Sequence, residues 1–574
     1  MATKRIVIDP LTRIEGHLRI EVEAADGKIA RAWTPCTQFR GIELVLRGRN
    51  PRDGWVYAQR ICGVCTSIHA LASIYAVENA LQYPIPPQAK AIRDLIALSQ
   101  MMQDHVIHFY HLQALDWVNV VNAAKADPAK AAALGAQMSD WPLNGVGAMK
   151  QVKEQVAKLL DSGQYSIFTN GYWSHPAYVL PPEVDLLALA HYLQALDWQR
   201  EMIKVHTIFG GKNPHPNFLV GGMASAINMD NQWTINQVRL DILQDLVEKA
   251  VAFVEQVYLP DVLAIGGFYK DYLQIGAANP NMMAAGLPGY AGGGEPTGRG
   301  AEAGGVLLDG NYQDVRPFEA GKIAEYVNSA WYSYTTGNDS ALPPYRGETT
   351  PNYTGPVPPF TWLSDQPQQS WTKIPRYDGV AMQTGPNARM LISHARQQPD
   401  VVELVDSSLK TLGADLNSLN STMGRIVARA IESVYCGRQY QKVFQGFVEG
   451  IKAGQTATFN PDKWEPHTWP SRAEGVGFVE APRGTLSHWV VIEDGKIANY
   501  QAVVPTTWNS SGVDPMGVPG PYAYSLAYGG NHPLIDPAAP LEVLRTIHSY
   551  DPCMSCAVHV LDATGAPITE VRVV

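Results

Sequence analysis

Two pairs of cysteines, one near each end of the chain, constrain the fold more than any other feature. Cys62 and Cys65 form the first Cys-x-x-Cys pair, and Cys553 and Cys556 form the second. Two intervening residues let both sulfurs of a pair bind one metal ion, and thiolates suit Zn²⁺, Fe–S clusters and other soft metals. A histidine follows each pair within four residues. One interpretation is therefore a single metal site that joins the two ends of a 574-residue chain.

Three other interpretations stay open on spacing alone. Two separate redox disulfides would fit, although the flanking sequence lacks a thioredoxin-like strand-to-helix setting. A structural zinc site usually has its two pairs within about 20 residues of each other, and here most of the chain lies between them. The third is a coincidence of buried cysteines. Six cysteines are too few for a disulfide scaffold, and Cys36 and Cys436 are interpreted as small apolar fillers.

Composition limits the class of protein. Hydrophobic residues make up 46% of the chain and charged residues 17%, against a usual charged share of about 25%. This excludes a disordered chain and predicts that a large fold or a partner covers much of the surface. The net charge of −10 disfavours a nucleic-acid partner. We expect no secretory signal and no transmembrane helix, because no apolar run of 18 residues is found.

Hydrophobic periodicity predicts an α+β fold. We expect one unit with a large, mainly helical core, a bundle of long helices, and small β-sheets from the N- and C-terminal regions. Alternating apolar and charged residues predict strands within 4–35 and 475–510. A Gly-rich stretch at 284–311 and a stretch rich in Pro, Tyr and Trp at 341–378 are interpreted as ordered loops. Helices are predicted at about 86–124, 148–162, 182–209, 234–266, 319–337, 386–396 and 402–453.

The residues around the cysteines are more specific than their spacing. The motifs are Asp9-Pro-Leu-Thr-Arg-Ile-Glu15-Gly-His17, Arg60-Ile-Cys-Gly-Val-Cys65, Ala481-Pro-Arg483-Gly and Asp551-Pro-Cys-Met-Ser-Cys-Ala-Val-His559. Together they resemble the large, catalytic subunit of nickel–iron hydrogenases. Further matches in the middle of the chain extend the resemblance from Ile6 to the C-terminus, and it is closest to the uptake enzymes that face the periplasm.

The resemblance implies a nickel–iron centre and the reaction H₂ ⇌ 2H⁺ + 2e⁻. Cys62 and Cys553 would be terminal nickel ligands. Cys65 and Cys556 would bridge nickel to an iron that also carries carbon monoxide and two cyanide ligands. Four soft thiolates would keep nickel electron-rich.

Two groups are candidates for the base that takes the proton from H₂. They are the thiolate of Cys553 and the guanidinium of Arg483, and arginine is a poor base because it stays protonated. We favour Cys553 as base, with Arg483 shaping the pocket and held by Asp104 and Asp551. Without the resemblance, Asp104 would be interpreted as an ordinary helix carboxylate.

The resemblance also assigns a proton relay and polar contacts to the centre. Glu15 would be the first carboxylate of the relay. Its alternative is an outward strand residue paired with a neighbouring arginine. His69 would form a hydrogen bond with a bridging sulfur, although a satisfied core histidine is an equal interpretation. Thr506, where many relatives have Ser, would donate with Arg483 to a cyanide nitrogen, and Pro482 would border the same ligands.

A second metal, Mg²⁺ or Fe²⁺, is implied near the centre. Its protein ligands would be the Glu43 carboxylate, His559 and the carbonyl of Ala502. Oxygen ligands suit Mg²⁺, whereas a histidine nitrogen is unusual for it, so the metal identity stays open. Lys373 and Gln501 would contact its water ligands.

The family pattern further predicts processing, partners and location. A maturation endopeptidase would cut after His559, leaving 1–559 as the working unit and releasing 560–574. Only Cys36 and Cys436 remain for electron transfer, so an Fe–S small subunit is expected as an obligate partner. Nickel chaperones and a membrane cytochrome or quinone-linked subunit are further expected partners. The pair would be exported together to the periplasmic side of the cytoplasmic membrane.

Two other functions are compatible with parts of this sequence pattern. One is a non-enzymatic subunit of a redox complex stapled by a four-cysteine zinc site. The other is the related quinone-reductase subunit family that has lost the cysteines, which is disfavoured because all four are present. Metal content distinguishes the zinc scaffold from a hydrogenase.

Overall fold

A computed structural model describes residues 4–165, 168, 171–223, 229, 234–287, 304–357, 360–528 and 531–557, with only the backbone for 556 and 557. The helices are α1 (Ile42–Leu46), α2 (Gly54–Gln59), α3 (Ile68–Leu81), α4 (Pro87–Ile107), α5 (Val120–Ala123), α6 (Pro128–Met138), α7 (Val146–Ser162), α8 (Pro182–Met202), α9 (Lys204–Gly210), α10 (Gln237–Phe253), α11 (Leu259–Phe268), α12 (Pro386–Ala395), α13 (Pro399–Leu412), α14 (Thr422–Lys452), α15 (Pro505–Asn509), α16 (Pro521–Ala523), α17 (Leu541–His548) and α18 (Met554–Ala557). The strands are β1 (Lys4–Ile8), β2 (Ile20–Ala25), β3 (Lys28–Trp33), β4 (Met282–Ala284), β5 (Gly305–Leu307), β6 (Ile323–Tyr326), β7 (Ile374–Tyr377), β8 (Arg472–Ala481), β9 (Gly484–Glu493) and β10 (Lys496–Val503).

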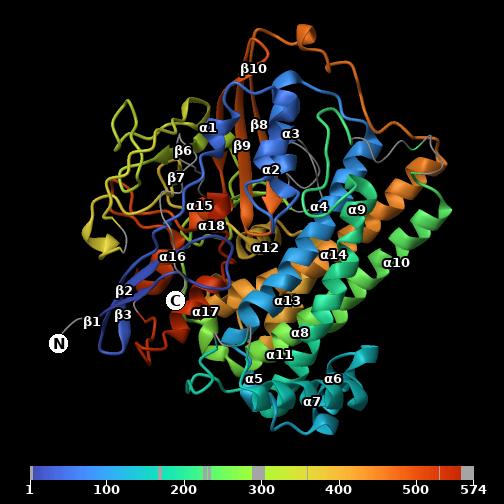
Figure 1. Cartoon of the computed structure of the whole chain (residues 1–574), viewed down its shortest axis with the longest axis vertical. Helices are drawn as coiled ribbons and strands as arrows, with labels where there is room; N and C mark the ends of the chain where they lie inside the picture. Colours follow the sequence, from blue (N-terminus) through green and yellow to red (C-terminus); the bar gives the residue numbers. More distant parts are fainter. Residues whose placement is uncertain are drawn as a thin grey trace.

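Long helices form one half of the molecule, and α4 and α14 lie side by side within it (Figure 1). Pro87 begins α4 at a position where a missing N–H is harmless. The Ser421 side chain accepts a hydrogen bond from the Gly424 N–H and so caps α14. Both helices are buried over most of their length.

An antiparallel sheet in the order β10-β9-β8 lies against α3 (Figure 1). The helix crosses β8 closely because Gly475 and Gly477 have no side chains there. A Cβ at these positions would lie 2.2 and 2.1 Å from the carbonyl oxygens of Ala76 and Ala72. The contact fixes α3, whose N-terminus follows the first cysteine pair, relative to the sheet.

The remaining strands form smaller sheets. The N-terminal strands pair in the order β1-β2-β3, and β2 and β3 turn at Asp26-Gly27 as the sequence predicts. Two-stranded antiparallel sheets join β4 to β5 and β6 to β7. The described residues are thus compatible with the predicted α+β fold, in which helices form the core and the sheets stay small.

Two helix predictions need correction. The helix predicted at 319–337 is wrong, because Ile323–Tyr326 forms β6 and pairs with β7. Buried Ile323, Glu325 and Val327 alternate with half-buried neighbours, which is the period of a strand. The helix predicted at 402–453 is two helices, since Gly413 ends α13 in a left-handed conformation.

The stretch Gln237–Phe268 is long and apolar enough to cross a membrane by composition alone. Half of its most apolar window is buried inside the protein. Its Asp261 is buried and accepts hydrogen bonds from the Tyr110 hydroxyl at 2.6 Å and from His191 at 2.8 Å. These contacts are those of a core helix.

Candidate metal centre

Three cysteines from opposite ends of the chain meet in the protein interior. The sulfur atoms of Cys62, Cys65 and Cys553 lie within 4.8 Å of one another, and all three side chains are buried. The Cys62 and Cys553 sulfurs are 3.5 Å apart. Cys556 lies one helical turn beyond Cys553 in α18, and its side chain is outside the described residues. The structure therefore places three of the four predicted ligands at one point.

The first pair lies in the loop between α2 and α3. The Cys65 backbone N–H donates to the Cys62 sulfur at 3.3 Å, so the two sulfurs are brought together locally. The Ile68 N–H donates to the Cys65 carbonyl at 3.2 Å where α3 begins. The close packing of α3 on β8 holds this loop against the strand that leads to Arg483.

The second pair is placed by the N-terminal region. Glu15 and Cys553 form a parallel β-bridge. The Met554 N–H donates to the Glu15 carbonyl at 2.7 Å, and the Glu15 N–H donates to the Pro552 carbonyl at 3.4 Å. Two segments from opposite ends of the sequence thus share backbone hydrogen bonds at the site.

The donor set fits a soft metal. The sulfurs are packed among apolar side chains, where a free thiolate would be destabilised by the loss of water. A metal ion that binds several thiolates removes this cost, and clustered sulfur favours nickel, iron or zinc over hard cations. The neighbouring apolar residues are Ile61, Ile68, Ala72, Ala481, Leu486 and Val504.

Arg483 lies in a buried ion network next to the cysteines. Its Nη1 is 3.2 Å from the Asp104 carboxylate, and its Nη2 is 2.9 Å from that of Asp551. Its Nε donates to the Asp551 carbonyl at 3.1 Å. Burial alone would lower the pKa of Arg483, but the charges of Asp551, Cys553 and Asp104 raise it well above its usual value. The guanidinium is therefore a fixed cation.

Asp104 is held in place for this contact. The Gln100 side chain donates to its other carboxylate oxygen at 2.6 Å. The two histidines that follow it in sequence point elsewhere: His105 pairs with Glu432, and His108 contacts the His548 carbonyl. Asp104 therefore belongs to the Arg483 network and not to a local helix cluster.

Glu15 contacts the C-terminal pair with its side chain as well as its backbone. One carboxylate oxygen lies 3.4 Å from the Cys553 sulfur and accepts the Ser555 N–H at 3.0 Å. Burial raises the pKa of Glu15, and the nearby charge of Cys62 adds to this rise. The alternative pairing with a neighbouring arginine is not formed, because Arg13 bonds Asp116 and Arg19 bonds Asp9 and Glu21.

Three further predicted residues line the cavity at the cysteines. They are His69, Pro482 and Thr506. The Thr506 hydroxyl accepts the Cys553 N–H at 3.3 Å, which leaves its own proton available for another acceptor. His69 Nδ1 lies 2.9 Å from His488 Nε2, and burial lowers the pKa of His69 to about 4. His69 is therefore neutral at neutral pH.

The predicted second metal site is a buried polar cluster. Glu43 accepts hydrogen bonds from Thr349 and from Lys373, the latter at 3.3 Å, and Lys373 also donates to Gln501 at 2.5 Å. The Ala502 N–H, not its carbonyl, contacts Glu43, at 2.9 Å. His559 lies outside the described residues, as do all of 558–574.

Glu325 is the residue of this cluster that points to a missing cation. Both of its carboxylate oxygens are buried without a hydrogen-bond partner among the described residues, and Lys373 lies 3.8 Å away. Burial raises the pKa of Glu325 to about 7, against the lowering effect of Lys373. Two buried carboxylates share one ammonium, so the donor set fits an added cation with its waters.

Cys36, Cys436 and Gln383 lie outside the centre. Cys36 and Cys436 are buried in hydrophobic clusters, as predicted for apolar fillers. Gln383 uses both ends of its amide, donating to Asn420 at 2.8 Å and accepting from Asn387 at 2.9 Å. It is a structural crosslink.

Sequence reasoning missed His488, Thr349 and Glu325. Each reaches the site from a segment without a recognisable motif. His488 lies in a buried strand, and its one signal is an imidazole directly before the apolar run Trp489–Ile492. Thr349 lies in the stretch predicted to be an ordered loop, and Glu325 lies in the stretch predicted to be a helix.

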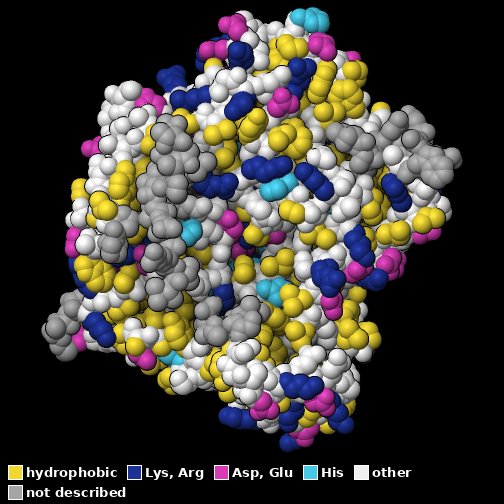
Figure 2. Space-filling view, in the orientation of Figure 1, with side chains coloured by type: hydrophobic (Ala, Val, Ile, Leu, Met, Phe, Trp, Pro, Cys, Tyr) yellow, Lys and Arg dark blue, Asp and Glu magenta, His cyan; other side chains and the backbone are white. Residues whose placement is uncertain are grey.

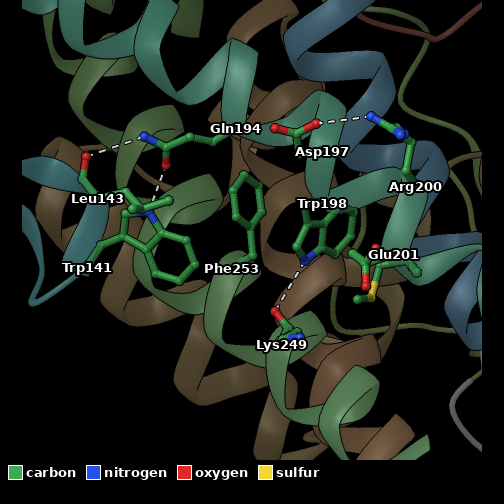
Figure 3. Close-up of a pocket in the computed structure, with 10 residues that line it drawn as sticks. Trp141, Leu143, Gln194, Asp197, Trp198, Arg200, Glu201, Lys249 and Phe253 are labelled. Carbon is green, nitrogen blue, oxygen red and sulfur yellow. Dashed lines mark hydrogen bonds and ion pairs between the residues drawn. The ribbon is translucent and has the colours of Figure 1, made fainter. Parts of the chain in front are cut away.

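A larger cavity lies elsewhere, between α8 and α10 (Figure 3). Its volume is about 440 Å³, and Trp141, Trp198 and Phe253 form aromatic walls. Asp197 and Glu201 bring carboxylates to it. None of the predicted site residues lines this cavity, so the catalytic candidates stay with the cysteines.

Comparisons with known proteins agree with the geometry. The family model for nickel-dependent hydrogenase matches residues 40–559, and a HoxL-like model matches residues 5–39. The chain is 46% identical to the uptake hydrogenase large subunit of Bradyrhizobium diazoefficiens, over 99% of this chain and 97% of the relative. It is 42% identical to the hydrogenase-1 large chain of Escherichia coli, over 100% and 98%.

A solved structure supports the same relationship. The Ni-Fe-Se hydrogenase from D. vulgaris Hildenborough in the reduced state superposes with a TM-score of 0.75 and 30% identity, covering 97% of this chain and 100% of that chain. Sequence, fold and the meeting of the cysteines therefore lead to one conclusion: the chain belongs to the nickel-dependent hydrogenase family.

Proposed function

We propose that this hydrogenase catalytic subunit binds its nickel–iron centre through Cys62, Cys65, Cys553 and Cys556. The observation that carries the proposal is the meeting of three buried sulfurs, from opposite ends of the chain, within 4.8 Å. When bound, the centre supplies the Lewis acidity and redox chemistry that split H₂ into protons and electrons. The zinc-stapled scaffold has no support from the relatives, which are hydrogenase large subunits.

Cys553 and Glu15 are the residues that move the proton. The Cys553 sulfur takes H⁺ from H₂, and the Glu15 carboxylate 3.4 Å away receives it next. The same carboxylate oxygen accepts the Ser555 N–H, which holds it next to the Cys553 sulfur. Arg483 does not act as base, because two carboxylates stabilise its charge.

Arg483, Pro482 and Thr506 shape the ligand pocket. The guanidinium is fixed at both ends by Asp104 and Asp551, and its charge faces the cavity that it lines with the cysteines. With the free proton of the Thr506 hydroxyl, it offers hydrogen bonds to cyanide nitrogens on the iron.

The Glu43 cluster holds the second cation, Mg²⁺ or Fe²⁺. Glu43 would be the direct ligand, and the orphaned oxygens of Glu325 would accept hydrogen bonds from its waters. Lys373 and Gln501 would complete that water shell. The Ala502 carbonyl would be a second ligand, which requires that its oxygen face the ion. His559 would supply the last protein ligand.

Electrons leave through an Fe–S small subunit. Cys36 and Cys436 are separate, buried and too few for a cluster. Figure 2 shows hydrophobic side chains in many places on one face, with charged side chains scattered among them, and such a mixture is compatible with a partner interface. Nickel chaperones load the centre before a maturation endopeptidase removes 560–574. The pair acts on the periplasmic side of the membrane with a cytochrome or quinone-linked subunit.

Metal analysis combined with infrared spectroscopy of the purified complex tests this proposal. We expect nickel, more iron than nickel because the Fe–S clusters of the small subunit add iron, and stretching bands of bound CO and CN⁻. Zinc without nickel, or nickel without these bands, would contradict the assigned centre. Mass spectrometry of the same sample, expected to end the chain at His559, tests the processing step.

A further inference from the structure

A chain of three buried polar side chains begins at His69 and runs into the protein. His69 Nδ1 lies 2.9 Å from His488 Nε2, and His488 Nδ1 lies 2.5 Å from the Tyr500 hydroxyl. The three side chains come from α3, β9 and β10. Their residues are 2%, 0% and 1% exposed, so water does not compete for these hydrogen bonds.

The donor-to-acceptor direction of these hydrogen bonds is set by Tyr500, the last of the three side chains. A buried phenol is the stronger hydrogen-bond donor towards an imidazole, and burial raises the pKa of Tyr500 so that it keeps its proton. Ser73 is the other hydroxyl near this phenol; it acts on Tyr500 as a donor, lowering its pKa, and the Ser73 oxygen accepts no hydrogen bond among the described residues. The Tyr500 O–H therefore donates to His488 Nδ1.

Each following step is fixed by the previous one. A neutral imidazole carries one N–H, so accepting at Nδ1 places the His488 proton on Nε2. That N–H then donates to Nδ1 of His69, which places the His69 proton on its own Nε2. His69 lines the cavity together with Cys65 and Cys553.

We propose that Tyr500 and His488 are positioning residues that fix the tautomer of His69, so that His69 presents an N–H, and not a lone pair, to the cysteine sulfurs. The inference rests on the proposed function in one respect, that these sulfurs are thiolates bound to the centre. A donor there stabilises the negative charge on sulfur. The opposite tautomer would direct a nitrogen lone pair at that charge.

Neutron diffraction from deuterium-exchanged crystals of the complete complex reads the tautomer directly. We expect deuterium on Nε2 of both His69 and His488, and on the Tyr500 oxygen. Deuterium on Nδ1 of His69 would overturn the proposal. The reading does not depend on metal content: a complex without nickel would contradict the proposed function and leave the tautomer measurable.

Three variants test the consequence in the holoenzyme. Tyr500→Phe removes the donor that starts the chain, and His488→Leu removes its middle. His488→Gln keeps it, because the amide oxygen can accept from Tyr500 while the amide N–H donates to His69. We expect about tenfold slower H₂ oxidation in the first two variants at unchanged nickel content, and near-normal rates in His488→Gln.

Pulsed paramagnetic resonance with ¹⁵N-labelled histidine supplies a readout that a merely structural role would not move. The coupling of the His69 N–H to the nickel spin should disappear in Tyr500→Phe and His488→Leu and persist in His488→Gln. An unchanged coupling in Tyr500→Phe, which removes a single oxygen atom and should fold, would overturn the proposal even if His488→Leu is unstable.

Discussion

Cys62 and Cys65 lie in a loop between two consecutive helices, whereas Cys553 lies in a segment held by distant parts of the chain. The first pair depends on the start of α3 and on the packing of that helix against β8. The second pair depends on the backbone of Glu15 and on the side chain of Arg483.

Further contacts hold the residues just before Cys553. His548 bonds Asp116 at 2.6 Å. Ser549 receives hydrogen bonds from two buried arginines of α14: Arg425 donates to its hydroxyl at 2.8 Å, and Arg429 donates to its carbonyl at 3.0 Å. The Arg425 guanidinium also lies 3.9 Å above the Tyr550 ring.

The two cysteine pairs therefore differ in the contacts that hold them: local contacts hold the first pair, and long-range contacts hold the second. A loop between neighbouring helices forms with those helices, but a segment that is held from four regions forms only when all of them are in place. Holding this segment in place costs conformational free energy. Asp551 adopts a left-handed backbone conformation, with φ 58°, which its contacts must stabilise. We infer that the C-terminal pair docks last.

The strongest test removes one ligand from each side of the comparison. Cys553→Ser and Cys62→Ser should both lose nickel and H₂ oxidation completely, because a hydroxyl is a harder and far less acidic ligand than a thiol. Metal analysis and H₂-dependent dye reduction measure the two effects. Cys436→Ala, a buried cysteine away from the site, is the control and should retain nickel. Normal nickel content in Cys553→Ser would refute the assignment.

A second variant separates chemistry from docking at the C-terminal pair. Glu15→Gln keeps the backbone bonds to Pro552 and Met554, and its amide oxygen can still accept the Ser555 N–H. We expect normal nickel content but H₂ oxidation slowed by about 10²–10⁴-fold, because the amide cannot carry a proton. Glu23→Gln, in strand β2 away from the cysteines, should leave the rate unchanged. Equal rates in Glu15→Gln and wild type would remove Glu15 from the relay.

The smallest expected effect is a loss of local stability in the segment before Cys553. Arg425→Met loses the charged hydrogen bonds to Ser549 and Gly276, each worth about 1.5–3 kcal/mol. Amide hydrogen exchange over 548–553 should accelerate at least about tenfold, with exchange over 62–69 unchanged. Arg438→Met, at a partly exposed position of the same helix, should change neither segment. Equal acceleration in both segments would contradict the distinction between the pairs.

The parts of the site that the sequence predicted are those that lie in contiguous motifs. Glu15, Arg483 and the cysteines are each recognisable from their neighbours, and long helices follow from apolar periodicity. His488 and Glu325 were missed because their roles arise from side chains of other secondary-structure elements, His69 and Lys373 respectively, which no local pattern places beside them. The incorrect helix at 319–337 has the same cause, since pairing with β7 decides its conformation.

The backbone bridge between Glu15 and Cys553 has a consequence for how the protein is made. Ribosomes synthesise the chain from the end that carries Glu15, so that segment must wait for its partner until nearly all of the message has been translated. A product of premature termination has the first cysteine pair and most of the core, yet it cannot assemble the site. The protein can therefore become active only after the ribosome has synthesised the chain through Cys553.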